Sequence, residues 1–310
     1  MINTLVRILV LATSLLFLPI LANASCNYED FEGWKDCFVK EKLSQRMNSV
    51  DVATFRSAQY VPKVIDLDKK QPEKKLTLKE YQKLIDINGK IARGKAFYKD
   101  NQELVENVAD EYKVNPEVIV ALIGLESDYG KNQGNYNIID SLATLSYEGR
   151  RKSFFEKELL NALTIAKNEK FKYENFQGSW AGAMGQCQFM PSSYLSYAVD
   201  YDNDGVKDIW NSKPDAVASA ANYLVKNGWQ MGHSSISRIY KLDKNYAQNC
   251  KNKDICNYKD NLNLIFVRNN DIVTDTFAVG KNYKVLMKWN RSNFFVLSIL
   301  TIADKIKMEG

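Results

Sequence analysis

The residue best suited to acid–base chemistry is Glu126, which directly follows the apolar run VIVALIGL (118–125). Apolar residues fall on every face of a helix here. The sequence therefore predicts a buried helix that has Asn115 as its N-cap, begins at Pro116 and ends at Glu126. Burial and the negative end of the helix both raise the pKa of a carboxyl group. A carboxyl that stays protonated near neutral pH can act as a general acid; the alternative is a carboxylate that reaches water past the helix end.

The stretch GSWAGAMGQCQF (178–189) holds three glycines within eight positions, whereas the whole chain of 310 residues has only 15. Backbone without side chains allows close approach of a ligand. Ser179, Trp180 and the amides of Gln186 and Gln188 suit a polar, uncharged, bulky ligand such as a sugar chain. The stretch thus predicts a saccharide-binding loop, and the alternative is a glycine-rich turn between packed helices.

The stretch DYDNDGVKDIWN (200–211) has the spacing of an EF-hand calcium loop. Positions 1, 3, 5, 6, 7 and 9 are Asp200, Asp202, Asp204, Gly205, the carbonyl of Val206 and Asp208. Position 12, which should be glutamate, is Asn211, and Asp215 could supply the missing carboxylate unless it serves as a helix N-cap. The loop predicts a structural Ca²⁺ site, and the alternative is a solvated acidic loop.

The surrounding chain predicts a mainly α fold with a small β part. Helical periodicity is present over residues 76–85, 95–114, 153–168, 214–227 and 294–307. Residues 25–75 form a polar, helical region that ends in a flexible connector, and residues 236–284 are rich in strand-forming residues.

The N-terminus has the pattern of a cleaved signal peptide, with the apolar run ILVLATSLLFLPIL (8–21) and a cut expected after Ala24. An uncleaved anchor is the alternative, while Asn23 disfavours lipidation at Cys26. We therefore expect a periplasmic or secreted protein. Disulfides are favoured in such a compartment, so we expect bonds between the near pairs Cys26–Cys37 and Cys250–Cys256. Cys187 is left over as a small buried hydrophobic residue.

Several classes of function are excluded or disfavoured. The single histidine, His233, rules out two-histidine zinc motifs, and the chain has neither a GxGxxG nor a Walker A loop. The net charge is +5, with the lysines spread along the chain, so nucleic acid is not an expected partner.

The segments LESDYG (125–130), GSWAGAMGQCQFMPSSY (178–194), the calcium-like loop and KWNRSNFFVLSI (288–299) occur in the order seen in the lytic murein transglycosylase B family, which the chain resembles over roughly 96–235 and 283–306. That resemblance implies an exported bacterial enzyme with a lysozyme-like helical core, a flanking helical domain and a small β insert. The expected domains are the signal peptide (1–24), an N-terminal helical region (25–95) joined by the C-terminal helix (285–310), the lysozyme-like core (96–235) and the β insert (236–284).

The resemblance also implies roles for individual residues. Glu126 matches the catalytic acid/base, and Ser179 matches a serine that forms a hydrogen bond with that glutamate. The positions that match substrate-binding residues are Gln188, Tyr223, Trp289, Phe295, Arg150 and Arg151. Trp289 and Phe295 stand where the family has tyrosines. The metal loop is matched by Asp200, Asp202, Asp204, Val206 and Asp215.

The implied reaction is cleavage of the β-1,4 bond between N-acetylmuramic acid and N-acetylglucosamine in peptidoglycan strands. Attack by the muramic C6 hydroxyl would leave 1,6-anhydromuramic ends. Glycosidases that use water usually need a second carboxyl. We expect none beside Glu126, because Asp128 should point elsewhere and Asp140 should be a helix N-cap. The alternatives are a hydrolytic muramidase and a non-catalytic, calcium-stabilised peptidoglycan-binding protein.

Overall fold

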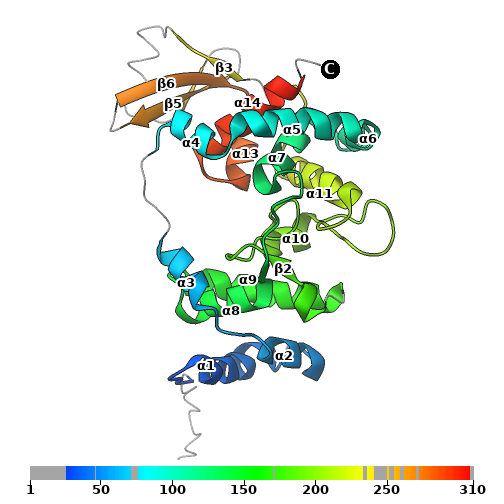
Figure 1. The fold of residues 1–310 in the computed structure, drawn as a ribbon, viewed down its shortest axis with the longest axis vertical. Helices are drawn as coiled ribbons and strands as arrows, with labels where there is room; N and C mark the ends of the chain where they lie inside the picture. Colours follow the sequence, from blue (N-terminus) through cyan, green and yellow to red (C-terminus); the bar gives the residue numbers. More distant parts are fainter. Residues whose placement is uncertain are drawn as a thin grey trace, which may run out of the picture.

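The computed structural model describes residues 26–45, 47–70, 76–169, 172–232, 236–240, 250, 255–258, 262–269 and 272–307. The expected signal peptide and His233 lie outside these ranges. The described chain is mainly helical with two small antiparallel sheets, which confirms the predicted fold class (Figure 1).

The first helices form the lower part of the molecule in Figure 1. They are α1 (Phe31–Phe38), the π-helical turn η1 (Val39–Leu43), α2 (Ser49–Arg56) and α3 (Pro62–Lys69). They pack against α8 (Ile138–Glu148) and α9 (Lys152–Asn168), with α3 on α8 and α2 on α9. The expected disulfide Cys26–Cys37 is present and fastens the chain ahead of α1 to that helix.

The next helices belong to the upper part of Figure 1. They are α4 (Leu78–Leu84), α5 (Ile87–Asp100), α6 (Gln102–Tyr112) and α7 (Pro116–Ser127), and the C-terminal α14 (Asn293–Lys307) packs against α4, α5 and α7. The region 25–95 therefore does not pack as one body: its first half joins α8 and α9, and its second half joins α14. The domain boundaries themselves stay a prediction.

The single helix expected over 95–114 is wrong, because the chain breaks at Asn101 between α5 and α6. The Asn101 side chain donates to the carbonyl of Phe97 at 2.7 Å. Asparagine competes in this way with the helical ladder, and α6 starts as a separate helix at Gln102.

Helix α7 is buried along its length, as its composition predicts. Asn115 holds the N-cap position, but its side chain donates to Glu117 instead of capping the helix. The helix ends at Ser127, one residue later than expected, because Asp128 and Tyr129 both adopt positive φ. Glu126 is thereby fixed in the last helical turn.

The middle of the molecule connects the two parts. It contains the short pair β1 (Tyr136–Asn137) and β2 (Gln177–Gly178), the 3₁₀ turn η2 (Tyr173–Asn175), α10 (Pro191–Tyr197) and α11 (Lys213–Lys226). The expected capping role of Asp140 is wrong, since Asn137 caps α8. Asp140 instead accepts hydrogen bonds from the Gln59 backbone and the Tyr173 hydroxyl, which tie the chain before α3 to α8.

The β insert is a four-stranded antiparallel sheet in the order β3–β6–β5–β4. Its strands are β3 (Ile236–Arg238), β4 (Ile255–Asn257), β5 (Asn263–Asn269) and β6 (Ile272–Val279), and α13 (Tyr283–Trp289) follows. Ile265 and Val267 of β5 face the main core, while Leu264 and Phe266 form a small cluster on the other side with Cys250. The expected disulfide Cys250–Cys256 lies there.

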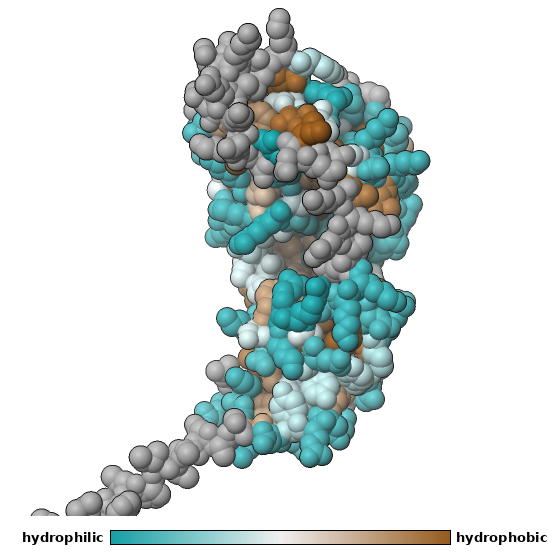
Figure 2. Space-filling model, turned by 90° about the vertical axis from the view of Figure 1, so that its left-hand side faces the viewer, coloured by the Kyte–Doolittle hydropathy of each residue, from teal (hydrophilic) through white to brown (hydrophobic). Residues whose placement is uncertain are grey.

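The molecule is elongated, and the face in Figure 2 carries most of its apolar (brown) surface near the end with the four-stranded sheet. Exposed apolar residues of that sheet are Ile255, Ile272 and Val273. No helix within the described ranges has the length and apolar character needed to cross a membrane.

Candidate active site

Glu126 lies in the last turn of α7, and its Oε1 accepts a hydrogen bond from the indole Nε1 of Trp289 at 2.8 Å. Burial raises the pKa of Glu126 to about 7, although the Trp289 bond and the positive charge of Lys90 act to lower it. The carboxyl therefore changes protonation state near neutral pH, as a group that both gives and takes a proton must.

The neighbouring carboxyl group, that of Asp128, forms ion pairs with two cations of α5. Its Oδ1 accepts from Arg93 at 2.8 Å and lies 3.6 Å from the ammonium group of Lys90. Lys90 also donates to the carbonyl of Gly124 at 2.8 Å. As expected, Asp128 points towards α5, where both cations lie, and among the described residues no second carboxyl contributes to the pKa of Glu126.

Aromatic rings pack around Trp289, the residue that donates to the acid. The ring of Trp289 lies 4.5 Å from Tyr223 and 5.3 Å from Phe189, and Tyr223 lies 4.6 Å from Tyr197. Tyr223 is buried, and burial raises its pKa to about 12, so its hydroxyl stays protonated. The structure thus brings Tyr223 into contact with Trp289, and Trp289 donates to Glu126.

The interpretation of Phe295 as a sugar platform is wrong. Its side chain is 5% exposed and packs into the main core, so neither ring face is open to a ligand. The preceding residue, Phe294, is the half-buried one, with its ring centroid 5.8 Å from that of Tyr81.

Ser179 is placed in the predicted loop but does not contact Glu126. Its Oγ accepts from the backbone N–H groups of Ala183 at 2.9 Å and Ala181 at 3.3 Å, and so shapes the turn 179–183. The bond that the resemblance implies between serine and glutamate is absent from the described residues, and Trp289 supplies a bond to the acid instead.

The glycines of this loop are explained by internal packing. A Cβ on Gly178 would lie 2.3 Å from the carbonyl oxygen of Ala183, and one on Gly185 would lie 2.6 Å from that of Ile209. Gly182 has a φ of +85° and faces the Leu142 side chain. The interpretation that these glycines leave room for a ligand is therefore wrong: the space is filled by the protein itself.

The two glutamines of the loop differ in exposure. Gln186 is buried and donates to the carbonyl of Trp210, so it is not available to sugars. Gln188 is half-buried at positive φ, and its amide nitrogen donates to the carbonyls of Gly185 at 2.9 Å and Gln133 at 3.1 Å. These bonds join the loop to the segment that follows α7.

The two arginines of the basic pair have separate partners, that of Arg150 on α3 and those of Arg151 on α9. Arg150 donates to the carboxylate of Asp68 at 3.3 Å and to its backbone carbonyl at 2.6 Å. The guanidinium of Arg151 lies over the rings of Phe154 and Phe155. No contact within the described ranges connects either arginine with Glu126.

The acidic loop brings three carboxylates together. One oxygen from each of Asp200, Asp202 and Asp204 lies within 4.8 Å of the others, and Gly205 has a φ of +93°. Asp215 does not join this cluster. It is fully buried, and its oxygens accept from the backbone N–H groups of Tyr201 at 2.7 Å and Asp208 at 2.8 Å, which closes the two ends of the loop.

Two residues near the acid were not predicted. They are Lys90 of α5, whose charge lowers the pKa of Glu126, and Tyr81 of α4, whose pKa is raised by burial and by the charge of Glu126. Nothing in the sequence links them to a residue some 40 positions away. Cys187 is buried, with its thiol donating to the carbonyl of Ala216 at 3.1 Å, which agrees with a packing role.

Comparison with known proteins identifies a family that this chain matches over most of its length. The family described as "Transglycosylase SLT domain" matches residues 30–304. A curated relative, membrane-bound lytic murein transglycosylase B of Escherichia coli (strain K12), is 40% identical over 153 residues. That match covers 49% of this chain and 42% of the relative, less than half of each.

Solved structures match over most of the chain. SltB3 from Pseudomonas aeruginosa, in complex with NAG-NAM-pentapeptide, has a TM-score of 0.81 and 31% identity, over 91% of this chain and 81% of its own. The same protein with NAG-anhNAM-pentapeptide gives 0.81 and 31%, over 90% and 80%. Escherichia coli Slt35 in complex with calcium has a TM-score of 0.72 and 26% identity, over 91% and 94%.

Proposed function

Because the chain belongs to the transglycosylase SLT domain family, we propose that it is a peptidoglycan lytic transglycosylase. It cleaves the β-1,4 bond between N-acetylmuramic acid and N-acetylglucosamine and leaves 1,6-anhydromuramic ends. The names of its relatives and the two sugar–pentapeptide ligands of SltB3 support this proposal. By the same likeness, its substrate is a glycan strand whose muramic residues carry peptides.

The observation that carries the proposal is the setting of Glu126. A pKa of about 7 leaves much of the carboxyl protonated at neutral pH, so it can give its proton to the glycosidic oxygen as the bond to C1 breaks. The resulting carboxylate then takes the proton of the muramic C6 hydroxyl while that oxygen forms a bond to C1. Glu126 ends the cycle protonated, and no water is consumed.

The structure favours this route over hydrolysis because, among the described carboxyl groups near the site, Glu126 is not accompanied by a second one that is free to act as a base. Asp128 is held by Arg93 and Lys90, and Asp140 is engaged by Gln59 and Tyr173. An attacking water would need a second carboxyl as base, whereas a hydroxyl already on the substrate is held within reach.

We further propose that the loop 200–206 holds Ca²⁺. The clustered oxygens of Asp200, Asp202 and Asp204 suit a hard cation, and the carbonyl of Val206 would add a further ligand. Asp215 would support the site indirectly, by holding the ends of the loop through the backbone N–H groups of Tyr201 and Asp208. When bound, the ion neutralises the carboxylates and fixes the loop. The calcium complex of Slt35 supports this assignment.

The same proposal places the protein outside the cytoplasm, in the periplasm or beyond it, where its substrate lies. The two disulfides and the predicted signal peptide support export. Fractionation of cells that express the full chain checks this, with the signal segment expected to be missing from the exported form.

The test of the reaction is mass spectrometry of the fragments that the protein releases from purified sacculi, with a hydrolytic muramidase run in parallel. Anhydromuramic ends, one water lighter than the muramidase products, are expected. Reducing muramic ends would instead identify a muramidase, and no release at all would identify a binding protein.

A further inference from the structure

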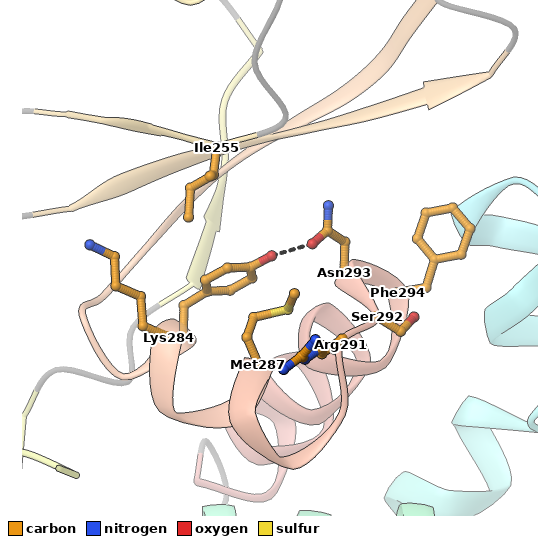
Figure 3. A pocket seen from close by; sticks show the side chains of 8 residues that line it. Ile255, Lys284, Met287, Arg291, Ser292, Asn293 and Phe294 are labelled. Carbon is orange, nitrogen blue, oxygen red and sulfur yellow. Dashed lines mark hydrogen bonds between the residues drawn. The ribbon is translucent and has the colours of Figure 1, made fainter. Parts of the chain in front are cut away.

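A cavity of about 770 Å³ lies between the sheet and the turn from α13 to α14. Figure 3 shows Ile255 of β4 pointing down into it from one wall, with the side chains of α13 and α14 forming the opposite wall. It is lined by Ile255, Tyr283, Lys284, Met287, Arg291, Ser292, Asn293 and Phe294. This volume is ample for a ligand of several residues.

Two cations line the cavity. Lys284 and Arg291 are both exposed, and within the described ranges neither has an acidic side chain at ion-pair distance. Met287 and Phe294 add apolar surface, while the Tyr283 hydroxyl donates to Asn293. Cations beside apolar and amide groups suit an anionic peptide better than a neutral sugar.

The lining of the cavity is connected to the acid through two side chains. Met287 precedes Trp289 by two residues and Arg291 follows it by two, and Trp289 donates to Glu126. On the other side, Phe294 lies against Tyr81, whose pKa responds to the charge of Glu126. The cavity lining and the reacting carboxyl thus have neighbours in common: Trp289 is on the helix that carries Met287, and Tyr81 contacts Phe294. These shared neighbours place the cavity on the α13 side of the acid, where a substituent of a sugar near the scissile bond would lie.

We propose that this cavity binds the peptide carried by a muramic residue next to the scissile bond, with Lys284 and Arg291 pairing with the carboxylates of that peptide. This inference rests on the proposed function for the nature of the substrate. It assigns selection of peptide-bearing strands to the wall formed by α13 and α14. Arg150 does not fill this role, because Asp68 already engages it.

The test uses the double variant Lys284→Ala/Arg291→Ala and two substrates, glycan strands with their peptides and the same strands after amidase treatment. KM for peptide-bearing strands should rise about tenfold, as expected for loss of charged hydrogen bonds, and KM for bare strands should stay within about twofold. Lys157→Ala/Lys226→Ala removes two exposed cations elsewhere and is the matched control. Lys284→Arg/Arg291→Lys keeps both charges and should retain most of the selectivity.

A binding measurement makes the result independent of catalysis. N-acetylmuramyl-pentapeptide, which has no glycosidic bond to cleave, should bind the double variant about tenfold more weakly than the wild type, by calorimetry. Equal affinity, or an equal loss on both strand substrates, overturns the inference. If the wild type cleaves neither strand while the difference in peptide affinity persists, the proposed reaction fails and the peptide site stands.

Discussion

At the scale of single residues, the pKa of Glu126 is set by opposing effects of its surroundings. Burial disfavours its charged form, while the Trp289 bond and Lys90 favour it, and burial prevails with a pKa of about 7. The indole is therefore a positioning residue that also limits how far the pKa rises. An indole N–H can only donate, so it keeps a carboxylate oxygen turned towards α13.

Replacing Trp289 by phenylalanine removes this donor but keeps an aromatic ring. The pKa of Glu126 should rise further, and the acid should stay protonated to higher pH. The alkaline limb of the profile of kcat/KM against pH is expected to move up by about one unit. Trp210→Phe is the control, since that indole donates to Gln177 instead. An unshifted limb in Trp289→Phe would show that the bond does not tune the acid.

Glu126→Gln keeps the shape of the side chain and an oxygen that can accept from Trp289, but it cannot cycle a proton. Product release from sacculi should fall by about 10²–10⁴-fold with the fold intact. Chromatography of the released fragments measures the activity, and a far-ultraviolet circular dichroism spectrum shows whether the fold is intact. Turnover near the wild-type rate would remove Glu126 from the mechanism.

Sequence patterns drew attention to Glu126 but not to the residues that surround it. The apolar run ahead of Glu126 is a local signal, whereas Tyr81 and Lys90 come near the acid only through tertiary packing. The resemblance assigned a sugar-stacking role to Phe295, whereas the partly open ring is that of its neighbour Phe294. Adjacent helical residues point about 100° apart, so one of two neighbouring rings is buried while the other is partly open.

At the scale of elements, the glycine-rich loop is a packing device. Gly182→Ala should destabilise the protein by about 2–4 kcal/mol, since it combines positive φ with overlap on Leu142. Gly228→Ala is the matched control: its φ is +96° with open space around it, so only about 1 kcal/mol is expected. Urea denaturation measures both. A stable Gly182→Ala protein with a raised KM would restore the ligand-approach explanation.

The acidic loop is the element in which we propose a bound Ca²⁺, beside the clustered carboxylates of Asp200, Asp202 and Asp204. Ca²⁺ at 100 times its Kd should stabilise the fold by about 2.7 kcal/mol and raise the melting temperature by several degrees. Thermal melts with calcium and with a chelator measure this, and Asp200→Asn/Asp204→Asn should abolish the difference. Coincident wild-type melts would argue for a solvated loop.

Helical periodicity predicted most of the helices, because the apolar residues that form the buried face of a helix recur at regular spacing within its own segment. It gave α7, α9, α11 and α14 within a residue or two. It missed the break at Asn101 and the Asn137 cap, because a single side-chain hydrogen bond decides each of them. Spacing likewise could not reveal that Asp215 closes the loop through backbone N–H groups.

At the scale of the whole molecule, the arrangement of the helices was not readable from sequence. A periodic apolar face indicates burial but not which partner covers it. Thus α3 lies on α8, where Arg150 meets the buried Asp68, and α14 returns from the C-terminus to cover α5 and α7. This return brings Trp289 to Glu126 across 163 positions of sequence.

The raised pKa of Glu126 also affects the stability of the whole molecule. Burial in the folded protein raises the pKa of Glu126 from its ordinary value of 4.5 to about 7. Between these values the folded state holds a proton that the unfolded state has lost, so the free energy of unfolding contributed by this group falls as pH rises and levels off above about 7.

Glutamine at position 126 has no proton to lose. The Glu126→Gln protein should therefore be more stable than the wild type at pH 8, by about 1–3 kcal/mol given that the side chain is partly open to solvent, and about equally stable at pH 4. Urea denaturation at the two pH values measures the difference, and Glu103→Gln, at an exposed site, should show almost none. If Glu126→Gln gained nothing at pH 8, its carboxylate would be well solvated in the folded protein. The site would then lack the raised pKa on which the proposed acid role depends.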